Sequence, residues 1–187
     1  PGTDILSVVR AYDIPVEYPD KVMDSLKDIP DEVDEADFVG RTDFRALPTV
    51  TIDGEDAKDL DDAITLSSAD GIYTLGVHIA DVSHYVKEKS PLDKEALKRG
   101  TSCYLVDSVI PMLPHKLSNG ICSLNAGTDR LTLSCVMKFD KKGKLLDHTI
   151  CEGILHVDER MTYTNVEKIL ERSDEKVLKR YEPLIPM

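Results

Sequence analysis

The chain has 187 residues, of which 41% are hydrophobic, 5% aromatic and 31% charged, and its net charge at pH 7 is −12. This length and hydrophobic fraction suit one domain of ordinary size with a substantial core. No run of 18 apolar residues occurs, so a membrane span is not expected. The sequence shows no secretory leader, and we therefore expect a cytoplasmic protein.

Four cysteines occur, and none of them belongs to a C-x-x-C pair; they are Cys103, Cys122, Cys135 and Cys151. Paired spacing of that kind is typical of structural zinc sites, so no zinc site is predicted. Cysteines of a protein without a secretory signal are expected to stay reduced. We predict free thiols, most of them buried.

The acidic charge is concentrated in two places. Residues 1–40 hold 11 acidic and 3 basic residues, and residues 53–62 hold 6 acidic residues and 1 basic residue. The rest of the chain is close to neutral. A nucleic-acid-binding domain usually shows a basic face, so the total charge argues against such a partner. The tight acidic loop at 53–62 nevertheless requires an explanation of its own.

Residues 1–40 form an acidic lead-in with scattered prolines, and residues 41–187 are predicted to form the folded domain. Within the lead-in we predict a short helix over 20–27, with Val22, Met23 and Leu26 on one face, and a helical turn over 31–37. The lead-in is interpreted as a linker that packs against the rest of the protein.

From residue 41 the pattern changes to strands. A turn signal at Asp70 and Gly71 separates two of them and predicts a hairpin. The second strand of that hairpin is largely apolar and is therefore expected to be central. The predicted strands cover residues 49–53, 63–67, 73–80, 101–106, 131–140 and 145–157.

Three helices are predicted after residue 90. Ser90 as N-cap, proline at the next position and Gly100 as stop signal predict a helix over 91–99. Thr164 and Glu167 fit a capping box for a helix to about residue 172. A further helical start at residue 175 is interrupted by prolines at positions 183 and 186. Strands and helices without strict alternation indicate an α+β fold, with a mixed, largely antiparallel sheet and packed helices.

The acidic loop contains four aspartates, Asp53, Asp59, Asp61 and Asp62, between two predicted core strands. Their charges repel one another, and a hard divalent cation such as Mg²⁺ compensates such repulsion best because it binds carboxylate oxygens and water. Two such metal ions can hold the attacking water and the leaving oxygen in phosphodiester cleavage. Bound metal also converts an acidic pocket into one that binds phosphate.

Two other interpretations of the loop compete with a catalytic metal site. An exposed, solvated turn would explain the composition equally well. A calcium loop of the EF-hand type does not fit, because Lys58 stands where that motif needs glycine and Ile64 where it needs glutamate. The loop alone therefore predicts a divalent metal and leaves the chemistry open.

Several ordered blocks give the chain a resemblance to the catalytic domain of the ribonuclease II family, and most to its ribonuclease R branch. The resemblance extends from about residue 41 to about residue 170. Blocks in matching order are far more specific than one motif. They lie at 51–54, 56–64, 76–86, 110–114, 117–125 and 160–163.

The resemblance implies a metal-dependent enzyme with an RNB-type catalytic domain. Members of this family degrade single-stranded RNA processively from the 3′ end, release nucleoside 5′-monophosphates and require a divalent metal, usually Mg²⁺ and with Mn²⁺ as an alternative. Their four catalytic, metal-binding aspartates correspond to Asp53, Asp59, Asp61 and Asp62, and a tyrosine that stacks near the 3′-terminal base corresponds to Tyr104.

The family's catalytic domain is longer than this chain and includes a catalytic arginine in the part not represented here. RNA-binding barrels of the cold-shock and S1 types flank it. We therefore expect this chain to be the N-terminal part of the catalytic domain, and inactive as an isolated fragment.

Alternatives in other functional classes remain open at this stage. The first is a catalytically silent module that binds RNA or a protein, and the second is a structural metal-binding domain. Among single residues, His78 lies inside an apolar strand and is expected to be structural, and Asp81 is expected to cap the following turn. Lys116 and Arg130 are interpreted as surface residues that confer solubility, with phosphate contact as the alternative.

Overall fold

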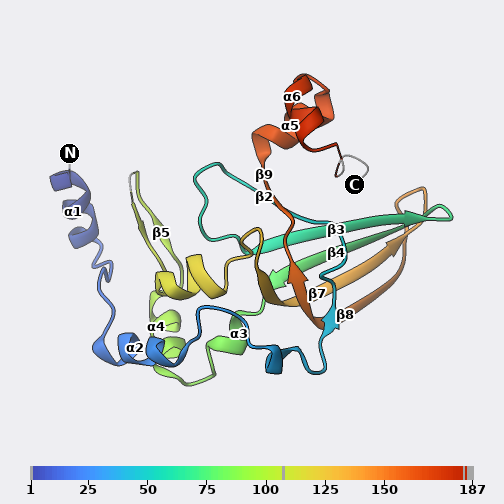
Figure 1. Cartoon of the computed structure of the whole chain (residues 1–187). Coiled ribbons are helices and arrows are strands. Elements are labelled where there is room, and N and C mark those ends of the chain that lie inside the picture. The colour runs from blue at the N-terminus through green and yellow to red at the C-terminus, as the bar shows by residue number, and fades with distance from the viewer. Residues whose placement is uncertain (1, 107, 183, 185–187) are drawn as a thin grey trace.

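The computed structural model describes residues 2–106, 108–182 and 184 of the chain, and Figure 1 shows their arrangement. Seven strands form one mixed sheet in the order β1-β8-β7-β4-β3-β2-β9. All neighbouring pairs are antiparallel except β1 with β8 and β2 with β9. The strands are β1 (Thr42–Asp43), β2 (Thr49–Asp53), β3 (Asp62–Ala69), β4 (Ile72–Ala80), β7 (Asp129–Phe139), β8 (Leu145–His156) and β9 (Glu159–Thr162).

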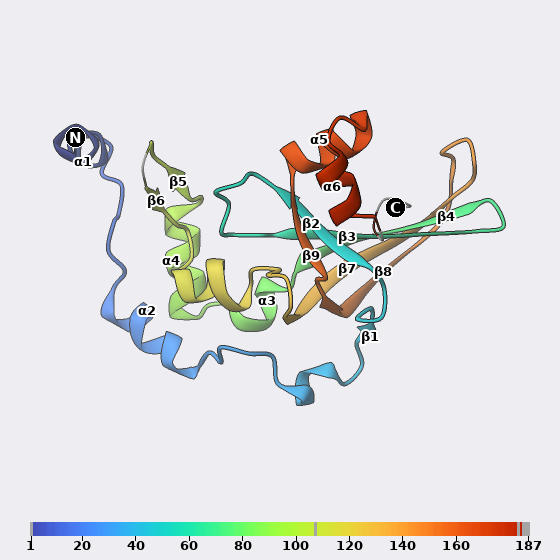
Figure 2. The same cartoon turned by 45° about the horizontal axis from the view of Figure 1, so that its top comes forward.

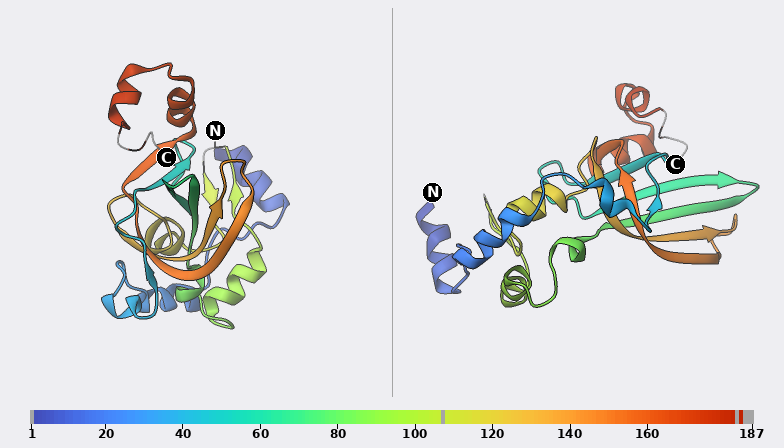
Figure 3. Two further views of the ribbon diagram at one scale, coloured as in Figure 1. Left: turned by 90° about the vertical axis from the view of Figure 1, so that its right-hand side faces the viewer. Right: turned by 60° about the horizontal axis from the view of Figure 1, so that its bottom comes forward.

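Helices lie at one end of the sheet and above its β2–β9 edge (Figures 1 and 3). The chain also forms short 3₁₀ segments at Leu26–Asp28 and Glu35–Phe38 and a π-helical segment at Lys116–Ile121. A separate two-stranded ribbon pairs β5 (Cys103–Tyr104) with β6 (Val109–Ile110). The helices are α1 (Gly2–Ala11), α2 (Asp20–Ser25), α3 (Val82–Tyr85), α4 (Pro91–Arg99), α5 (Tyr163–Glu171) and α6 (Glu175–Arg180). This is the α+β architecture with a largely antiparallel sheet that the sequence predicts. Within the described residues, no helix is both long and apolar enough to cross a membrane.

Two long hairpins, β3–β4 and β7–β8, form the body of the sheet and project away from the helices (Figure 3). Asp70 and Gly71 both have positive φ angles, of 52° and 78°, as a tight hairpin turn requires. β4 is the fourth of the seven strands, which confirms the prediction that this apolar strand is central.

The main hydrophobic core lies between the sheet and the α2, α4 and 113–124 segments, with Leu117, Leu124 and Leu155 fully buried. A second, smaller cluster joins α5 and α6 to the outer side of β2 and β9, around Val50 and Met161. Helix α4 is capped as predicted: the Ser90 hydroxyl accepts from the Asp93 amide, and Gly100 ends the helix.

The lead-in runs below the sheet from α1 through α2 to β1 (Figure 2). Val22 and Leu26 of this segment are buried in the main core, so it packs against the folded domain as expected. Met23 was predicted on the same face, but it is 48% exposed. Helix α1 is not among the predicted elements, and the helical turn predicted over 31–37 lies slightly later, because the 3₁₀ segment covers Glu35–Phe38.

Three predictions for the second half need correction. The strand expected over 101–106 is paired only at Cys103–Tyr104, because the ribbon turns before β6. Helix α5 begins one residue before Thr164, and its cap is the Thr162 hydroxyl, which accepts from the Asn165 amide. All four cysteines are free, as predicted, but only Cys122 is fully buried. The predicted helix stops at positions 183 and 186 lie outside the described residues.

His78 lies at the centre of a buried polar row that crosses the sheet. Its Nε2 lies 3.0 Å from Thr65 Oγ1, and its Nδ1 lies 2.8 Å from Ser134 Oγ. The Phe44 ring packs edge-on against the imidazole, with centroids 4.9 Å apart. Burial lowers the pKa of His78 to about 4, so the ring is neutral at physiological pH. These contacts confirm the structural role predicted for this histidine.

Candidate active site

The acidic loop connects two neighbouring antiparallel strands. Asp53 is the last residue of β2 and Asp62 is the first residue of β3, so both are held by the sheet. Asp59 and Asp61 lie in the intervening segment, which has no regular secondary structure. The fold therefore brings the two ends of the loop together at one end of the β2–β3 pair.

Asp53 and Asp61 lie close enough to the other loop carboxylates for those charges to affect their ionisation. Burial raises the pKa of Asp53, and the charge of Asp62, together with a smaller effect of Asp59, adds to the rise. Burial also raises the pKa of Asp61, with additions from Asp59, Asp62 and Asp53 in that order. Burial is the largest cause of both rises, and the neighbouring carboxylates add to it because like charges disfavour the ionised form.

Asp53 also carries an unsatisfied polar atom. Its Oδ2 is buried and has no hydrogen-bond partner among the described residues. A buried carboxylate oxygen without a partner is costly, and an oxygen-binding divalent cation would remove that cost. No group of three or more acidic, histidine or cysteine side chains in the described part of the chain is already arranged as a metal site. The donor set fits a hard cation, and its members lie near one another without converging.

The distal half of the loop is fixed by Ser123. The Ser123 hydroxyl accepts a hydrogen bond from the Leu60 amide at 3.0 Å and lies 3.1 Å from the Lys58 carbonyl. The amide of Leu124 donates to the Leu60 carbonyl at 2.8 Å. Ser123 is fully buried, so these contacts tie the loop rigidly to the 117–124 segment. Sequence reasoning assigned no role to this serine.

The proximal half of the loop is held by Arg160 from β9. Its Nη2 donates to the carbonyl oxygens of Gly54, Glu55 and Ala57 at 3.0, 2.8 and 2.8 Å. The positive charge of Arg160 also opposes the rise in the pKa of Asp53. Position 160 was noted in the sequence only as part of a block at 160–163.

Tyr104 lies beside the acidic loop although 45 positions separate it from Asp59. Its hydroxyl donates to Asp59 Oδ2 at 2.6 Å. The hydrogen bond to this carboxylate raises the pKa of Tyr104 to about 12. The side chain is 67% exposed, so its ring remains accessible from solvent. The structure thus brings this predicted substrate-binding residue to the predicted catalytic loop.

Three other polar residues, Asp81, Arg130 and Lys116, make contacts that bear on their predicted roles. Asp81 caps α3, as predicted, by accepting from the His84 amide. Arg130 was interpreted as a surface residue, but it is 6% exposed and donates to the carbonyls of Ser123 and Gly120. Lys116 donates to the Leu26 carbonyl at 3.1 Å and so ties the lead-in to the domain.

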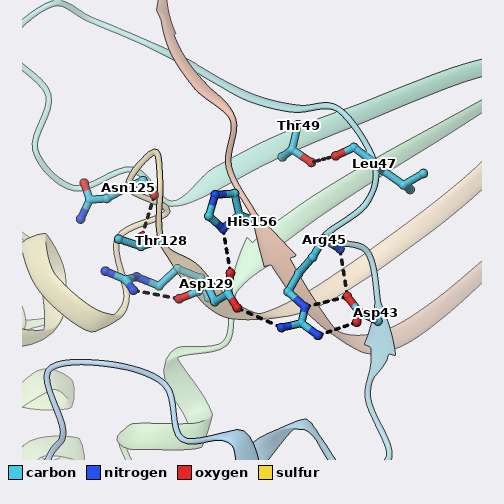
Figure 4. Close-up of polar contacts among 9 residues, drawn as sticks. Asp43, Arg45, Leu47, Thr49, Asn125, Thr128, Asp129 and His156 are labelled. Atoms are coloured by element: carbon cyan, nitrogen blue, oxygen red, sulfur yellow. Dashed lines mark hydrogen bonds and ion pairs between the residues drawn. The ribbon is translucent and has the colours of Figure 1, made fainter.

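A second polar cluster, shown in Figure 4, joins β1, β7 and β8. Arg45 donates to both oxygens of Asp43, at 2.9 and 2.7 Å, and to Asp129 at 3.1 Å, while His156 Nδ1 lies 2.7 Å from Asp129. Two shallow cavities of about 390 and 450 Å³ adjoin this cluster, and none of the four loop aspartates lines them. The charges here are already paired, so the cluster is best explained as a link between strands.

Comparison with known proteins shows the family of this chain. Residues 41–183 match the family model of the RNB domain, so the chain belongs to the RNB domain family. Within that family it is similar to ribonuclease R 1 of Lactococcus lactis subsp. lactis (strain IL1403), with 52% identity over 181 residues, covering 96% of this chain and 22% of the relative. Ribonuclease R of Thermotoga maritima is 51% identical over 186 residues, which cover 98% of this chain and 26% of that relative. The chain therefore spans about a quarter of the length of these curated relatives.

Solved structures agree with this assignment. The structure of Mycoplasma genitalium RNase R in complex with double-stranded RNA is 32% identical, with a TM-score of 0.86, and the match covers 92% of this chain and 31% of that one. Yeast Ssd1, a pseudonuclease, shares the fold with a TM-score of 0.69 and 19% identity. That match covers 78% of this chain and 18% of Ssd1. The expected resemblance to the ribonuclease R branch is confirmed.

Proposed function

We propose that the protein carrying this chain is a metal-dependent 3′-to-5′ exoribonuclease that hydrolyses single-stranded RNA processively to nucleoside 5′-monophosphates. The observation that carries the proposal is the gathering of four aspartates at the β2–β3 loop, with one buried carboxylate oxygen that has no partner within the described chain. Membership of the RNB domain family and similarity to ribonuclease R support it.

In this proposal Asp53, Asp59, Asp61 and Asp62 are the catalytic and metal-binding residues, and the cation is Mg²⁺ or Mn²⁺. When bound, the metal neutralises charge on the scissile phosphate and lowers the pKa of the attacking water. The protein's own contribution is positioning. Asp53 and Asp62 are fixed by strands, and Arg160 and Ser123 fix the segment between them.

The proposed substrate is single-stranded RNA, and Tyr104 is the proposed stacking residue for a base beside the acidic loop. Its exposed ring and its hydroxyl bond to Asp59 support this role, because a base stacked on the ring would lie beside the aspartates. The chain is close to neutral outside its two acidic stretches, so it offers few phosphate contacts of its own. RNA-binding barrels elsewhere in the protein would supply them, and a cytoplasmic location completes the proposal.

A catalytically silent module is the second candidate, because the same fold occurs in a pseudonuclease. The fold alone therefore does not decide between catalysis and binding. The presence of all four aspartates favours catalysis, since a module that only binds RNA has no need for a repulsive carboxylate group.

Metal titration combined with an RNA-decay assay on the full-length protein tests the proposal. We expect labelled RNA with a single-stranded 3′ tail to shorten from that end and release nucleoside 5′-monophosphates when Mg²⁺ or Mn²⁺ is added. Chelation with EDTA should stop the reaction. RNA that binds without decaying at any metal concentration would support the silent module, and metal binding without RNA binding would support a structural metal domain.

Two substitutions of Tyr104 distinguish the contribution of its ring to RNA binding from that of its hydroxyl. Tyr104→Ala in the full-length protein should weaken binding of a single-stranded RNA by roughly 1–3 kcal/mol, the usual contribution of one stacked base. Tyr104→Phe keeps the ring and loses the bond to Asp59, so RNA affinity should stay near that of the original protein. Fluorescence anisotropy with metal replaced by Ca²⁺ or EDTA measures this affinity without turnover.

Tyr73 provides the matched control for Tyr104. It is 44% exposed and lies near the tip of the β3–β4 hairpin, where it pairs with Ser68. Tyr73→Ala should leave RNA affinity unchanged. An equal loss of affinity in both alanine variants, or a loss in Tyr104→Phe as large as in Tyr104→Ala, would argue against stacking at position 104.

A further inference from the structure

The segment that presents the four aspartates has little structure of its own. Between β2 and β3 it contains one turn, closed by the Ala57 amide and the Gly54 carbonyl at 3.2 Å. Glu55, Asp56 and Lys58 are exposed, and only Ala57 and Leu60 of the residues between Gly54 and Asp61 pack against the main core. A loop with so few internal contacts would be mobile unless other parts of the fold held it.

Arg160 supplies the contacts on the proximal side. β9 pairs with β2 in parallel, with Arg160 opposite Thr51. Arg160 therefore lies on the neighbouring strand, close to the residue at which the loop begins. The two N–H groups of Nη2 are shared among the carbonyl oxygens of Gly54, Glu55 and Ala57, all within 3.0 Å. Charged donors make stronger hydrogen bonds than neutral ones, so one side chain holds three carbonyl groups within the stretch 54–57.

The choice of acceptors is informative. Arg160 lies among acidic residues, yet in the described part of the chain it forms no ion pair with a carboxylate, and its side-chain hydrogen bonds go to backbone oxygens. Its own Nε and the Oδ2 of nearby Asp53 are both buried without a partner among the described residues. The arginine thus holds the loop backbone and binds none of the aspartate oxygens itself.

We infer that Arg160 is a positioning residue for the aspartate loop: it fixes the backbone of residues 54–57 so that the carboxylates stay poised for a divalent cation without being neutralised by an ion pair. The inference rests on the proposed function, because the cation is part of that proposal. Lysine cannot replace arginine fully, since an ammonium is a compact charge on a flexible stem, without the guanidinium's planar donor geometry.

The test compares Arg160→Gln, Arg160→Lys and Arg45→Gln in the full-length protein. Arg45 is the matched control because its guanidinium also makes several hydrogen bonds but contacts Asp43 and Asp129, not the loop. Amide hydrogen exchange without metal is measured for the peptide that covers residues 54–61 and for peptides of β7 and β8. Arg160→Gln should speed exchange in the loop about tenfold or more, as the loss of a charge-assisted hydrogen bond implies, and leave β7 and β8 unchanged.

A second measurement separates positioning from a general structural role. The Mg²⁺ concentration for half-maximal RNA hydrolysis should rise about tenfold in Arg160→Gln, while the rate at saturating Mg²⁺ stays near the original, because a looser loop binds the cation less well but is reordered by it. The half-maximal Mg²⁺ concentration of Arg160→Lys should lie between those of Arg160→Gln and the original protein, and that of Arg45→Gln should equal the original value. Simple destabilisation would lower the saturated rate without moving the midpoint.

Three results would overturn the inference. These are unchanged exchange in the loop, an equal rise of exchange in β7 and β8, and faster loop exchange without a shift in the Mg²⁺ midpoint. If the original protein hydrolyses no RNA at any metal concentration, the proposed function fails. Direct Mn²⁺ binding to the variants then replaces the midpoint, and together with the exchange data it still decides the role of Arg160.

Discussion

Asp61→Asn in the full-length protein is expected to reduce RNA hydrolysis by about a hundredfold or more while RNA binding survives. Asparagine has nearly the size of aspartate, and the backbone at this position is held independently of the side chain, since the Asp61 carbonyl accepts from the Ala80 amide at 3.0 Å. The substitution removes one anionic oxygen ligand from the proposed metal site. The loss should therefore appear in the chemical step, where the cation acts.

Single-turnover decay of a 3′-tailed RNA, with a parallel binding titration, measures the two effects separately. Asp56→Asn is the matched control, because Asp56 is an exposed aspartate of the same loop outside the proposed set of four. It should retain near-normal hydrolysis. Near-normal hydrolysis by Asp61→Asn would remove Asp61 from the catalytic set, and an equal loss of binding and hydrolysis would indicate that the loop has only a structural role.

The parts of the fold that could be predicted are those determined by residues adjacent in the sequence. The β3–β4 hairpin follows from strand patterns on either side of Asp70 and Gly71, and α4 follows from Ser90 and Gly100. In each case a few adjacent positions determine the backbone geometry. The short strands β1 and β9 were missed because two and four residues carry no clear periodicity, and α1 was missed although Ile5, Val8 and Val9 have helical spacing.

For the candidate site, the sequence supplied the carboxylates but not their supports. Asp53, Asp59, Asp61 and Asp62 lie within ten positions, so their proximity is a local property of the chain. The contact of Tyr104 with the loop depends on how the β5–β6 ribbon packs. The support from Arg160 depends on a parallel pairing of strands more than 100 positions apart, for which no local pattern exists.

The folded state should lose stability as the pH falls from about 6.5 toward 4, because His78 is buried in its neutral form. Its pKa is about 4 in the folded protein against a usual value of 6.5, so the unfolded chain binds the proton more readily. Stability from this histidine is fully present above pH 6.5 and is lost as the pH falls through that interval. Each unit of pKa difference corresponds to about 1.4 kcal/mol, so the loss between pH 7 and pH 5 is roughly 2 kcal/mol.

Chemical denaturation of the 187-residue chain at pH 7 and pH 5, for the original protein and His78→Gln, isolates this effect. Other acidic groups, among them Asp53 and Asp61 with their raised pKa values, contribute equally to both proteins and cancel in the difference. Glutamine can still bond to Thr65 or Ser134 and does not titrate, so His78→Gln should lose about 2 kcal/mol less on acidification. His148→Gln, at an exposed position on β8, should behave like the original protein. An identical response of the original protein and His78→Gln to acid would mean that His78 does not resist protonation, and that the buried polar row tolerates a charge at the centre of the sheet.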